Sequence, residues 1–406
     1  MTPLTTIIGL ALTITLGALQ AATITVNDLA DIVADDGGCT LREAIIAVNT
    51  DVPSGSMPGE CTGGSPDPTI DRIEFASGVT GVINLSSALP PVQDPAEIIG
   101  PGVDSLTIDA AAQTTSAATM RIIAPTTIER LRIANTRSTA SGGAINASQP
   151  LTLRLVMIEN NEGLEGGAVF TTDNLTVEDC EFVNNSASQF TGGAIRFAGA
   201  GNTLIIRRSL FQDNRTLATA RAGGAIDVGG SDHITEISAS TFVGNQTEGG
   251  NSEGGAIRIG GQSLFLTNST FTDNAATRSG GAVSLRAINP IIANVTISGN
   301  TADSDNDGVG QAGGLWIPNN TPTIRNSVIA GNQDLGGQAS DCEGTAFSDG
   351  YNLIGDGSGC SGFSDGVNGD QVGSTAAPIT PTIAARIVEA MMVAAARPPF
   401  TPPSSL

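Results

Sequence analysis

The amino-acid sequence predicts an all-β fold, a right-handed parallel β-helix with a short N-terminal helical cap. Two motifs that recur together along the chain predict the solenoid, and the composition agrees with it. Of 406 residues, 51 are glycine, 3% are aromatic and 14% are charged, as expected for short strands joined by tight turns. The right hand follows from the strong preference of parallel strands for right-handed crossovers.

The first motif is Gly-Gly followed by an apolar pair, and it returns about every 24 to 33 residues. It begins at Gly142, Gly166, Gly192, Gly223, Gly254, Gly280 and Gly313. The second motif, an aromatic or aliphatic residue followed three positions later by Asn, comes after each Gly-Gly at a nearly constant distance. Its pairs are Ile158/Asn161, Phe182/Asn185, Phe211/Asn214, Phe242/Asn245, Phe271/Asn274, Ile297/Asn300 and Ile329/Asn332. A unit of constant length with one variable loop is typical of a solenoid.

Each unit also predicts how its chain bends. An aliphatic residue stands five positions before the second motif, as Ile206 stands before Phe211, and a small residue such as Ser209 stands two positions before it. Because side chains alternate faces along a strand, positions five apart both point inward only if the chain turns a corner between them. We expect about three strands per coil and about ten coils, with stacked phenylalanines inside, stacked asparagines at one turn and Gly-Gly at a tight corner.

The ends of the chain differ from the repeats. Residues 1–22 are predicted to be a signal peptide: Ile7–Leu19 is an apolar run too short to span a bilayer, and Ala21 and Ala22 follow it, although no Lys or Arg precedes it. Residues 23–66 are expected to form an N-terminal cap region and residues 67–373 the β-helix. Residues 374–406 contain no glycine, and we expect a helix and a Pro-rich tail there. No later segment is predicted to cross a membrane.

The charge of the chain limits the classes of partner that it can bind. The formal net charge is −22, and every basic residue is arginine. Because phosphate contacts need clustered positive charge, nucleic-acid binding is not expected. The acidic balance favours solubility and cation binding.

The cysteines suggest disulfides in an exported protein. The local pairs Cys39 with Cys61 and Cys342 with Cys360 are predicted to be bridged, with free thiols as the alternative. Cys180 takes a position that holds Ser or Val in other units, so it is expected to be a small buried core residue. His233 is the only histidine, which argues against a zinc site.

A known group shares several of these motifs. The segment "GGCTLREAIIAVN", residues 37–49, resembles the Cys-Ser-Leu-Arg-Glu-Ala motif near the start of many secreted bacterial β-helix proteins, with Thr40 in place of Ser. The Gly-Gly-Ala-Ile and Phe-x-x-Asn repeats, and "NLIGDGSGC" at residues 352–360, resemble polymorphic outer-membrane proteins. The resemblance covers about residues 25 to 377 and implies a right-handed parallel β-helix at the cell surface or in the medium. It implies no activity.

The segment with the Cys-Thr-Leu-Arg-Glu-Ala motif also predicts the cap. Leu41, Ala44, Ile45 and Val48 lie at helical spacing, so a short amphipathic helix is expected over residues 39–49. Such a helix would cover the open end of the solenoid. The adjacent Arg42 and Glu43 are expected to be structural rather than catalytic.

One loop has the spacing of a calcium site. Asp303, Asp305 and Asp307 alternate and are followed by Gly308, which suits an oxygen-ligated calcium ion. The twelfth position of an EF-hand loop, where Glu would complete the site, holds Gly314. A plain acidic loop is the alternative. Calcium is the only cofactor that the sequence suggests.

No set of catalytic residues stands out. The polygalacturonase-like set of Asn-Thr-Asp, Asp-Asp, Gly-His-Gly and Arg-Ile-Lys is missing, and His233 is expected to lie at the surface. Five arginines could line a strand face, either as a groove for acidic sugars or as a plain polar face exposed to solvent: Arg196, Arg207, Arg208, Arg258 and Arg286.

The favoured function is that of an exported surface or extracellular protein, adhesin-like or glycan-binding and without catalysis. Its partner would be a polysaccharide or the surface of a host or neighbouring cell, bound through repeated side chains. The alternatives are a lyase or glycoside hydrolase acting on an acidic polysaccharide, and a structural envelope protein.

Overall fold

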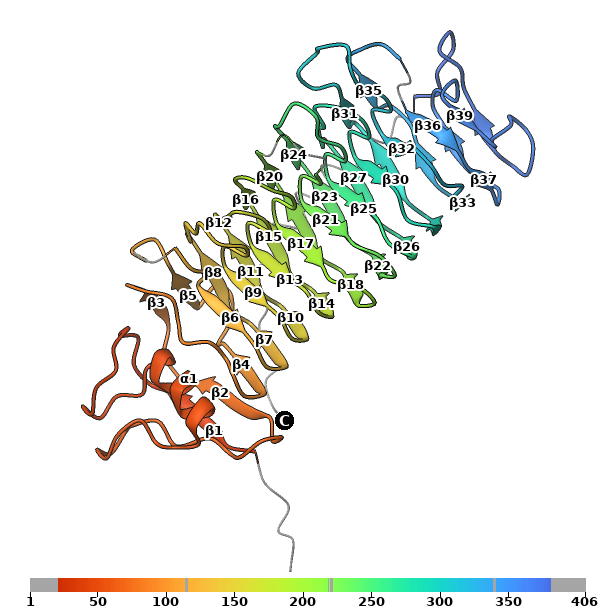
Figure 1. The fold of residues 1–406 in the computed structure, drawn as a ribbon. Coiled ribbons are helices and arrows are strands. Elements are labelled where there is room, and N and C mark those ends of the chain that lie inside the picture. Colours follow the sequence, from red (N-terminus) through yellow and green to blue (C-terminus); the bar gives the residue numbers. More distant parts are fainter. Residues whose placement is uncertain (1–20, 114–115, 218, 220–221, 339–340, 381–406) are drawn as a thin grey trace, which may run out of the picture.

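The computed structural model describes residues 21–380 except 114–115, 218, 220–221 and 339–340. Residues 1–20 of the predicted signal peptide and most of the predicted Ala/Pro-rich tail therefore lie outside the described residues. The described chain is an elongated solenoid in which three long sheets are built from parallel strands stacked in sequence order (Figure 1). This arrangement confirms the predicted parallel β-helix.

Twelve strands form the first sheet, sheet A, where about ten coils were expected. Its strands are β1 (Thr23–Val26), β2 (Asp71–Phe75), β4 (Ala96–Ile99), β7 (Thr126–Glu129), β10 (Leu151–Arg154), β14 (Leu175–Glu178), β18 (Thr203–Arg207), β22 (Ile234–Ser238), β26 (Ser263–Thr267), β29 (Asn289–Ala293), β33 (Thr323–Arg325) and β37 (Phe347–Ser348). Strand β1 belongs to the segment predicted as the cap region, yet it pairs with β2.

Sheet B also has twelve strands. They are β3 (Gly81–Asn84), β5 (Leu106–Asp109), β8 (Arg132–Ala134), β11 (Met157–Glu159), β15 (Glu181–Val183), β19 (Leu210–Gln212), β23 (Thr241–Val243), β27 (Thr270–Thr272), β30 (Thr296–Ser298), β34 (Val328–Ile329), β38 (Leu353–Ile354) and β40 (Gln371–Val372).

Sheet C has ten strands, and shorter strands lie between sheets B and C. Sheet C contains β6 (Met120–Ile122), β9 (Ile145–Ala147), β13 (Val169–Thr171), β17 (Ile195–Ala198), β21 (Ile226–Gly229), β25 (Ile257–Ile259), β28 (Val283–Leu285), β32 (Leu315–Ile317), β36 (Cys342–Thr345) and β39 (Cys360–Ser361). Sheet D contains β12 (Glu162–Gly163), β16 (Ser186–Ala187), β20 (Arg215–Thr216) and β24 (Gln246–Thr247), and β31 (Thr301–Ala302) pairs with β35 (Gln333–Asp334).

The inside of the solenoid is filled by like residues from successive coils. Four phenylalanines of sheet B are fully buried and stack with ring centroids 4.6–4.8 Å apart: Phe182, Phe211, Phe242 and Phe271. The aliphatic residues five positions earlier, such as Ile206 and Ile237, pair in register in sheet A and are also fully buried. The predicted corner between the two positions is therefore present.

The predicted asparagine ladder follows the Phe stack at the next turn. Each side-chain amide donates to the side-chain oxygen of the next coil at 2.8–3.0 Å, and the ladder ends on Asp341. Its members are Asn161, Asn185, Asn214, Asn245, Asn274, Asn300 and Asn332. Because each one is buried, the ladder satisfies polar groups that would otherwise be costly inside the protein.

The Gly-Gly corner needs glycine for two different reasons. Gly254, the first of its pair, has φ +69°, a conformation that disfavours side chains. A Cβ on the second, Gly255, would lie 2.0 Å from the carbonyl oxygen of Gly281 in the next coil. The repeated motif therefore marks a place where neighbouring coils approach too closely for any other residue.

The N-terminal end is covered by α1 (Leu41–Thr50), which begins two residues later than predicted (Figure 1). Thr40 and Glu43 form a capping box at its start, and Arg42 forms an ion pair with Asp31 at 2.7 Å. Both residues of the Arg-Glu pair thus hold the cap in place. The Cys39–Cys61 disulfide, with a Cα separation of 4.7 Å, joins the start of this helix to the following loop.

The other cysteines also lie where the sequence predicts. Cys342 and Cys360 form a disulfide between β36 and β39, which links the last two strands of sheet C. Cys180 is free and buried, and burial raises the pKa of its thiol to about 12. A thiol of this kind is a core residue and not a nucleophile.

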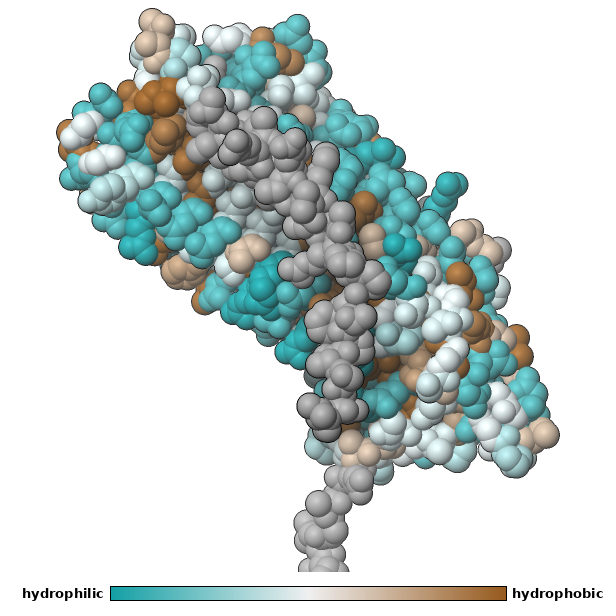
Figure 2. All heavy atoms as spheres, turned by 180° about the vertical axis from the view of Figure 1, so that it is seen from behind, coloured by the Kyte–Doolittle hydropathy of each residue, from teal (hydrophilic) through white to brown (hydrophobic). Residues whose placement is uncertain are grey.

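The described residues contain no candidate for a membrane-spanning helix. No helix there combines the length and the apolar character needed to cross a bilayer. From behind, hydrophobic residues lie in small groups among hydrophilic ones (Figure 2), as is usual for a surface in contact with water.

Candidate functional site

The outward face of sheet C carries side chains suited to binding. Side chains in this face stack in register across six consecutive coils. We call this row the sheet C strip; its members are Phe170, Arg196, Asp227, Arg258, Ser284 and Trp316. Because neighbouring strands are about 4.8 Å apart, the two aromatic ends of the strip are about 24 Å from each other.

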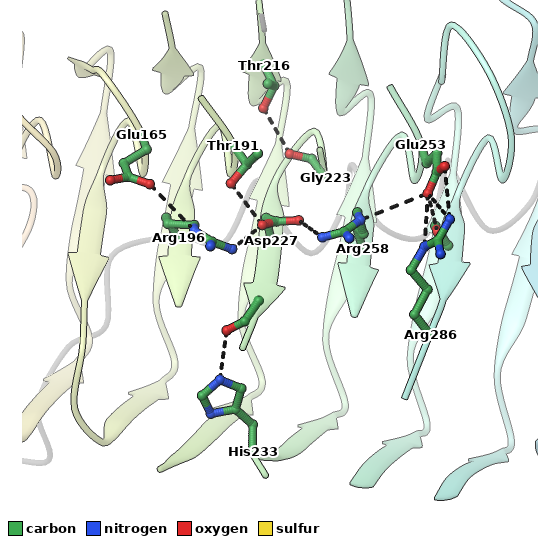
Figure 3. Close-up of polar contacts among 12 residues, drawn as sticks. Glu165, Thr191, Arg196, Thr216, Gly223, Asp227, His233, Glu253, Arg258 and Arg286 are labelled. Carbon is green, nitrogen blue, oxygen red and sulfur yellow. Dashed lines mark hydrogen bonds and ion pairs between the residues drawn. The ribbon is translucent and has the colours of Figure 1, made fainter. Parts of the chain in front are cut away.

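Ion pairs hold the centre of the strip in one arrangement (Figure 3). Asp227 pairs with Arg196 on one side and with Arg258, at 3.0 Å, on the other. The hydroxyl of Thr191 donates to the same carboxylate at 2.8 Å. Although Asp227 points outward from the sheet, its side chain is only 1% exposed, since these three residues cover it.

Carboxylates from the adjoining loops extend the network in both directions. Glu165 lies 3.6 Å from Arg196, and Glu253 lies 3.9 Å from Arg258. Glu253 is fully buried and accepts hydrogen bonds from Arg286 at 2.8 and 3.0 Å. The described network therefore joins three arginines to three carboxylates, and their formal charges cancel.

Trp316 is held by the end of the same network. The Arg286 guanidinium lies over the indole ring, 4.9 Å from its centroid, which is a cation–π distance. A cavity of about 240 Å³ opens beside the indole, lined also by Arg278, Gln311 and Gln338. Trp316 thus forms one wall of a small polar cavity and has a fixed ring orientation.

The acidic loop predicted to bind calcium forms another wall of this cavity, through Gly308, Val309 and Gly310. One carboxylate oxygen each from Asp303, Asp305 and Asp307 lies within 4.8 Å of the others. Asp303 is buried, and its two oxygens accept hydrogen bonds from the backbone amides of Asp307 and Gly308, both at 3.0 Å. Partial burial and the neighbouring Asp307 charge raise the pKa of Asp305.

The structure brings the three loop carboxylates together, and calcium binding stays a prediction. Since Asp303 also shapes the loop, Asp305→Asn is the sharper variant, because it removes a charge and leaves the hydrogen bonds of Asp303 with the Asp307 and Gly308 amides in place. We expect calorimetry to detect calcium binding to the native protein and a loss of about tenfold or more in the variant. Equal calcium binding by both proteins, or none by the native protein, would show that the segment is a plain acidic loop.

The arginines expected on one strand face are divided between faces. Arg196, Arg258 and Arg286 belong to the sheet C network, whereas Arg207 lies in sheet A and Arg208 at the next corner. The side chains of Arg196 and Arg258 are 20% exposed and bonded to carboxylates. The five arginines therefore do not line one strand face, although Arg196 and Arg258 occupy equivalent outward positions in sheet C.

The expected surface position of His233 is also wrong. His233 is fully buried at the corner between β21 and β22. Its ring packs edge-on against Phe197, with centroids 5.0 Å apart, and its Nε2–H donates to the Gly229 carbonyl at 2.7 Å.

Sequence reasoning missed the partners that define the site: Asp227, Glu253, Glu165 and Trp316. The residue in the outward position varies, with Arg at only two of the six places, so no repeat marks it. One available signal was position: Asp227 stands at the same distance after its Gly-Gly motif as Arg196 and Arg258 after theirs. Opposite charges at successive equivalent places predict ion pairs between coils.

One comparison with known proteins bears on this region. Residues 268–286 match the Chlamydia polymorphic membrane protein (Chlamydia_PMP) repeat. The matched segment includes Phe271, Asn274 and the corner at Gly280, which are the elements of one coil. No curated protein and no solved structure matches the chain significantly.

The chain is a parallel β-helix protein that carries a repeat of this kind. The repeat and the two disulfides together indicate an envelope or extracellular protein, because disulfides persist in oxidising compartments.

Proposed function

We propose that the protein is an exported, adhesin-like surface or extracellular protein that binds a polysaccharide along the sheet C strip. The observation that carries this proposal is the row of outward side chains from Phe170 to Trp316, which are in register and fixed by ion pairs. Aromatic rings offer a flat apolar face to a sugar ring, while the partly exposed guanidinium groups of Arg196 and Arg258 can donate to its oxygens.

The strip suits a polymer better than a small molecule. Its two aromatic residues stand at opposite ends, about 24 Å apart, so only an extended ligand can contact both. The cavity at Trp316 would take one sugar, and the strip between would contact the following ones. Because the network is held in place without a ligand, little ordering is needed on binding.

The charges of the strip favour a neutral polysaccharide over an acidic one. Three described arginines face three described carboxylates, so the strip offers an anion no net attraction. Binding should therefore depend weakly on salt, in contrast to binding through clustered positive charge.

The same network argues for binding rather than catalysis. A glycosidase needs two carboxylates positioned to donate a proton and to attack or activate water. Here the carboxylates of Asp227 and Glu253 are buried and each pairs with two arginines, so neither is presented to a sugar on the outer surface. Their arrangement serves to fix the surface.

A panel of neutral and acidic polysaccharides tests the proposal. The polymers are sized by chromatography before and after incubation with the protein and calcium. We expect at least one neutral polymer to keep its length and to carry the protein with it. Shortened chains would establish an enzyme instead, and the absence of co-migration with every polymer would favour a purely structural role.

A further inference from the structure

A second polar groove lies on a different face, over the short strands of sheet D. Its volume is about 560 Å³, and it is lined by side chains from the turn between sheets B and D. Those used in the argument are Arg137, Glu162, Asn160, Asn184, Ser186 and Arg215. The Gly-Gly corner follows sheet D along the chain, so this groove and the sheet C strip are separate.

The arginines of this groove differ from most others in the described chain. Four described arginines form no ion pair with a described residue, and each of the four lines a cavity: Arg121, Arg137, Arg215 and Arg278. The sheet D groove contains two of them. In a chain with net charge −22, two arginines without an ion pair in one groove mark a place where an anion can be accepted.

The strand register shows the order in which the side chains of the groove follow one another along the solenoid. Arg137, Glu162, Ser186 and Arg215 follow one another on consecutive coils. Arg215 thus has Ser186 as its nearest neighbour in the row, whereas Arg137 stands beside the carboxylate of Glu162. An oxyanion is therefore best placed at Arg215, away from Glu162.

Exposed amides run beside this row and suit a sugar. Asn160 and Asn184 lie at exposed left-handed turn positions, and the amide of Asn184 donates to the Asn160 oxygen at 2.7 Å. Side-chain amides can both donate to and accept from hydroxyl groups. Apart from Ala111 the lining residues are polar, which suits a sugar better than an apolar peptide side chain.

We infer that the sheet D groove binds a segment of a polysaccharide that carries oxyanions, either carboxylate or sulfate. The oxyanion pairs with the Arg215 guanidinium, whose planar fork matches such groups. Asn160, Asn184 and Ser186 bond the sugar hydroxyls. This inference does not rest on the sheet C strip, which favours neutral polymers.

Two substitutions with opposite expected effects test the inference. The probes are polygalacturonate for carboxylate and dextran sulfate for sulfate, measured by affinity electrophoresis at 0.15 M salt, where the Debye length is about 8 Å. Arg215→Gln should weaken binding to one or both polymers by about tenfold or more. Glu162→Gln should strengthen it, because it removes the like charge.

Two further variants test whether a loss of polyanion binding is specific to the sheet D groove. Arg325→Gln removes an exposed arginine that pairs with Asp349 in another part of the surface, and it should leave binding unchanged. Trp316→Ala should also leave the affinity for the anionic polymers unchanged, whatever it does to neutral ones. Native affinity in Arg215→Gln, an equal loss in Arg325→Gln or a loss of polyanion binding in Trp316→Ala would each overturn the inference.

Discussion

Phe211→Ala is expected to lower the free energy of unfolding by about 3–5 kcal/mol. Phe211 is fully buried, and its ring stacks on Phe182 and Phe242, each with centroids 4.8 Å away. Removing the ring leaves a cavity between two coils and breaks both stacking contacts. Because each coil of a solenoid contacts only its neighbours, the loss falls on the middle of the chain and should divide the unfolding transition.

The measurement is urea unfolding followed by circular dichroism. Phe347→Ala is the matched control: Phe347 is the same residue type, in sheet A, but 60% exposed. The control should change stability by less than about 0.5 kcal/mol. Similar losses in both variants would mean that the Phe stack does not form the core.

Asp227→Asn is expected to cost about 3 kcal/mol of stability, because it leaves Arg196 and Arg258 without the charge that they share. The substituted side chain has nearly the same shape, so packing is preserved and the effect reports on charge. The two arginines are 20% exposed and can turn partly toward water, which keeps the cost at the lower end of the range for buried pairs.

Asp179→Asn provides the comparison for this ion pair. Asp179 pairs with Arg208 at 2.7 Å, but the side chains are 40% and 52% exposed. An exposed pair contributes little, so thermal unfolding should show a loss below about 1 kcal/mol. If Asp227→Asn were no more harmful than Asp179→Asn, the sheet C network would not be a fixed structure.

Much of the fold is predictable from the sequence, because the interior repeats. The Phe stack, the Asn ladder and the Gly-Gly corner each reflect a position where every coil meets the same surroundings, so the same residue type returns. Cys180 could be placed correctly for the same reason: its neighbours in the stack are serines or valines, and it is buried among them.

The outward face could not be predicted in the same way. Some residues there contact loops whose lengths vary, so the ion pairs of Glu165 and Glu253 depend on how far each loop reaches. The equivalence of Arg196 and Arg258 was recognised from the sequence. Their ion-pair partners were not: Asp227 lies between the two arginines, and Glu253 lies beside Arg258. His233 shows the same limit, because it lies at a corner outside the two repeated motifs, where no repeat indicates that it is buried.

The acidic loop is an intermediate case. Its alternating aspartates could be recognised from the sequence, and the structure brings their carboxylates together. Its place beside Trp316 could not be predicted, since the two are joined only through the cavity that Gly308, Val309 and Gly310 help to line.

The most direct test of polysaccharide binding by the sheet C strip is the affinity of Trp316→Ala for the neutral polymer that the panel selects. We predict a loss of about tenfold or more, with stability unchanged within about 1 kcal/mol, since the indole lies on the outer face. Phe347→Ala, which removes an exposed aromatic ring from sheet A, should bind as the native protein does. Native affinity in Trp316→Ala, or an equal loss in Phe347→Ala, would contradict the account.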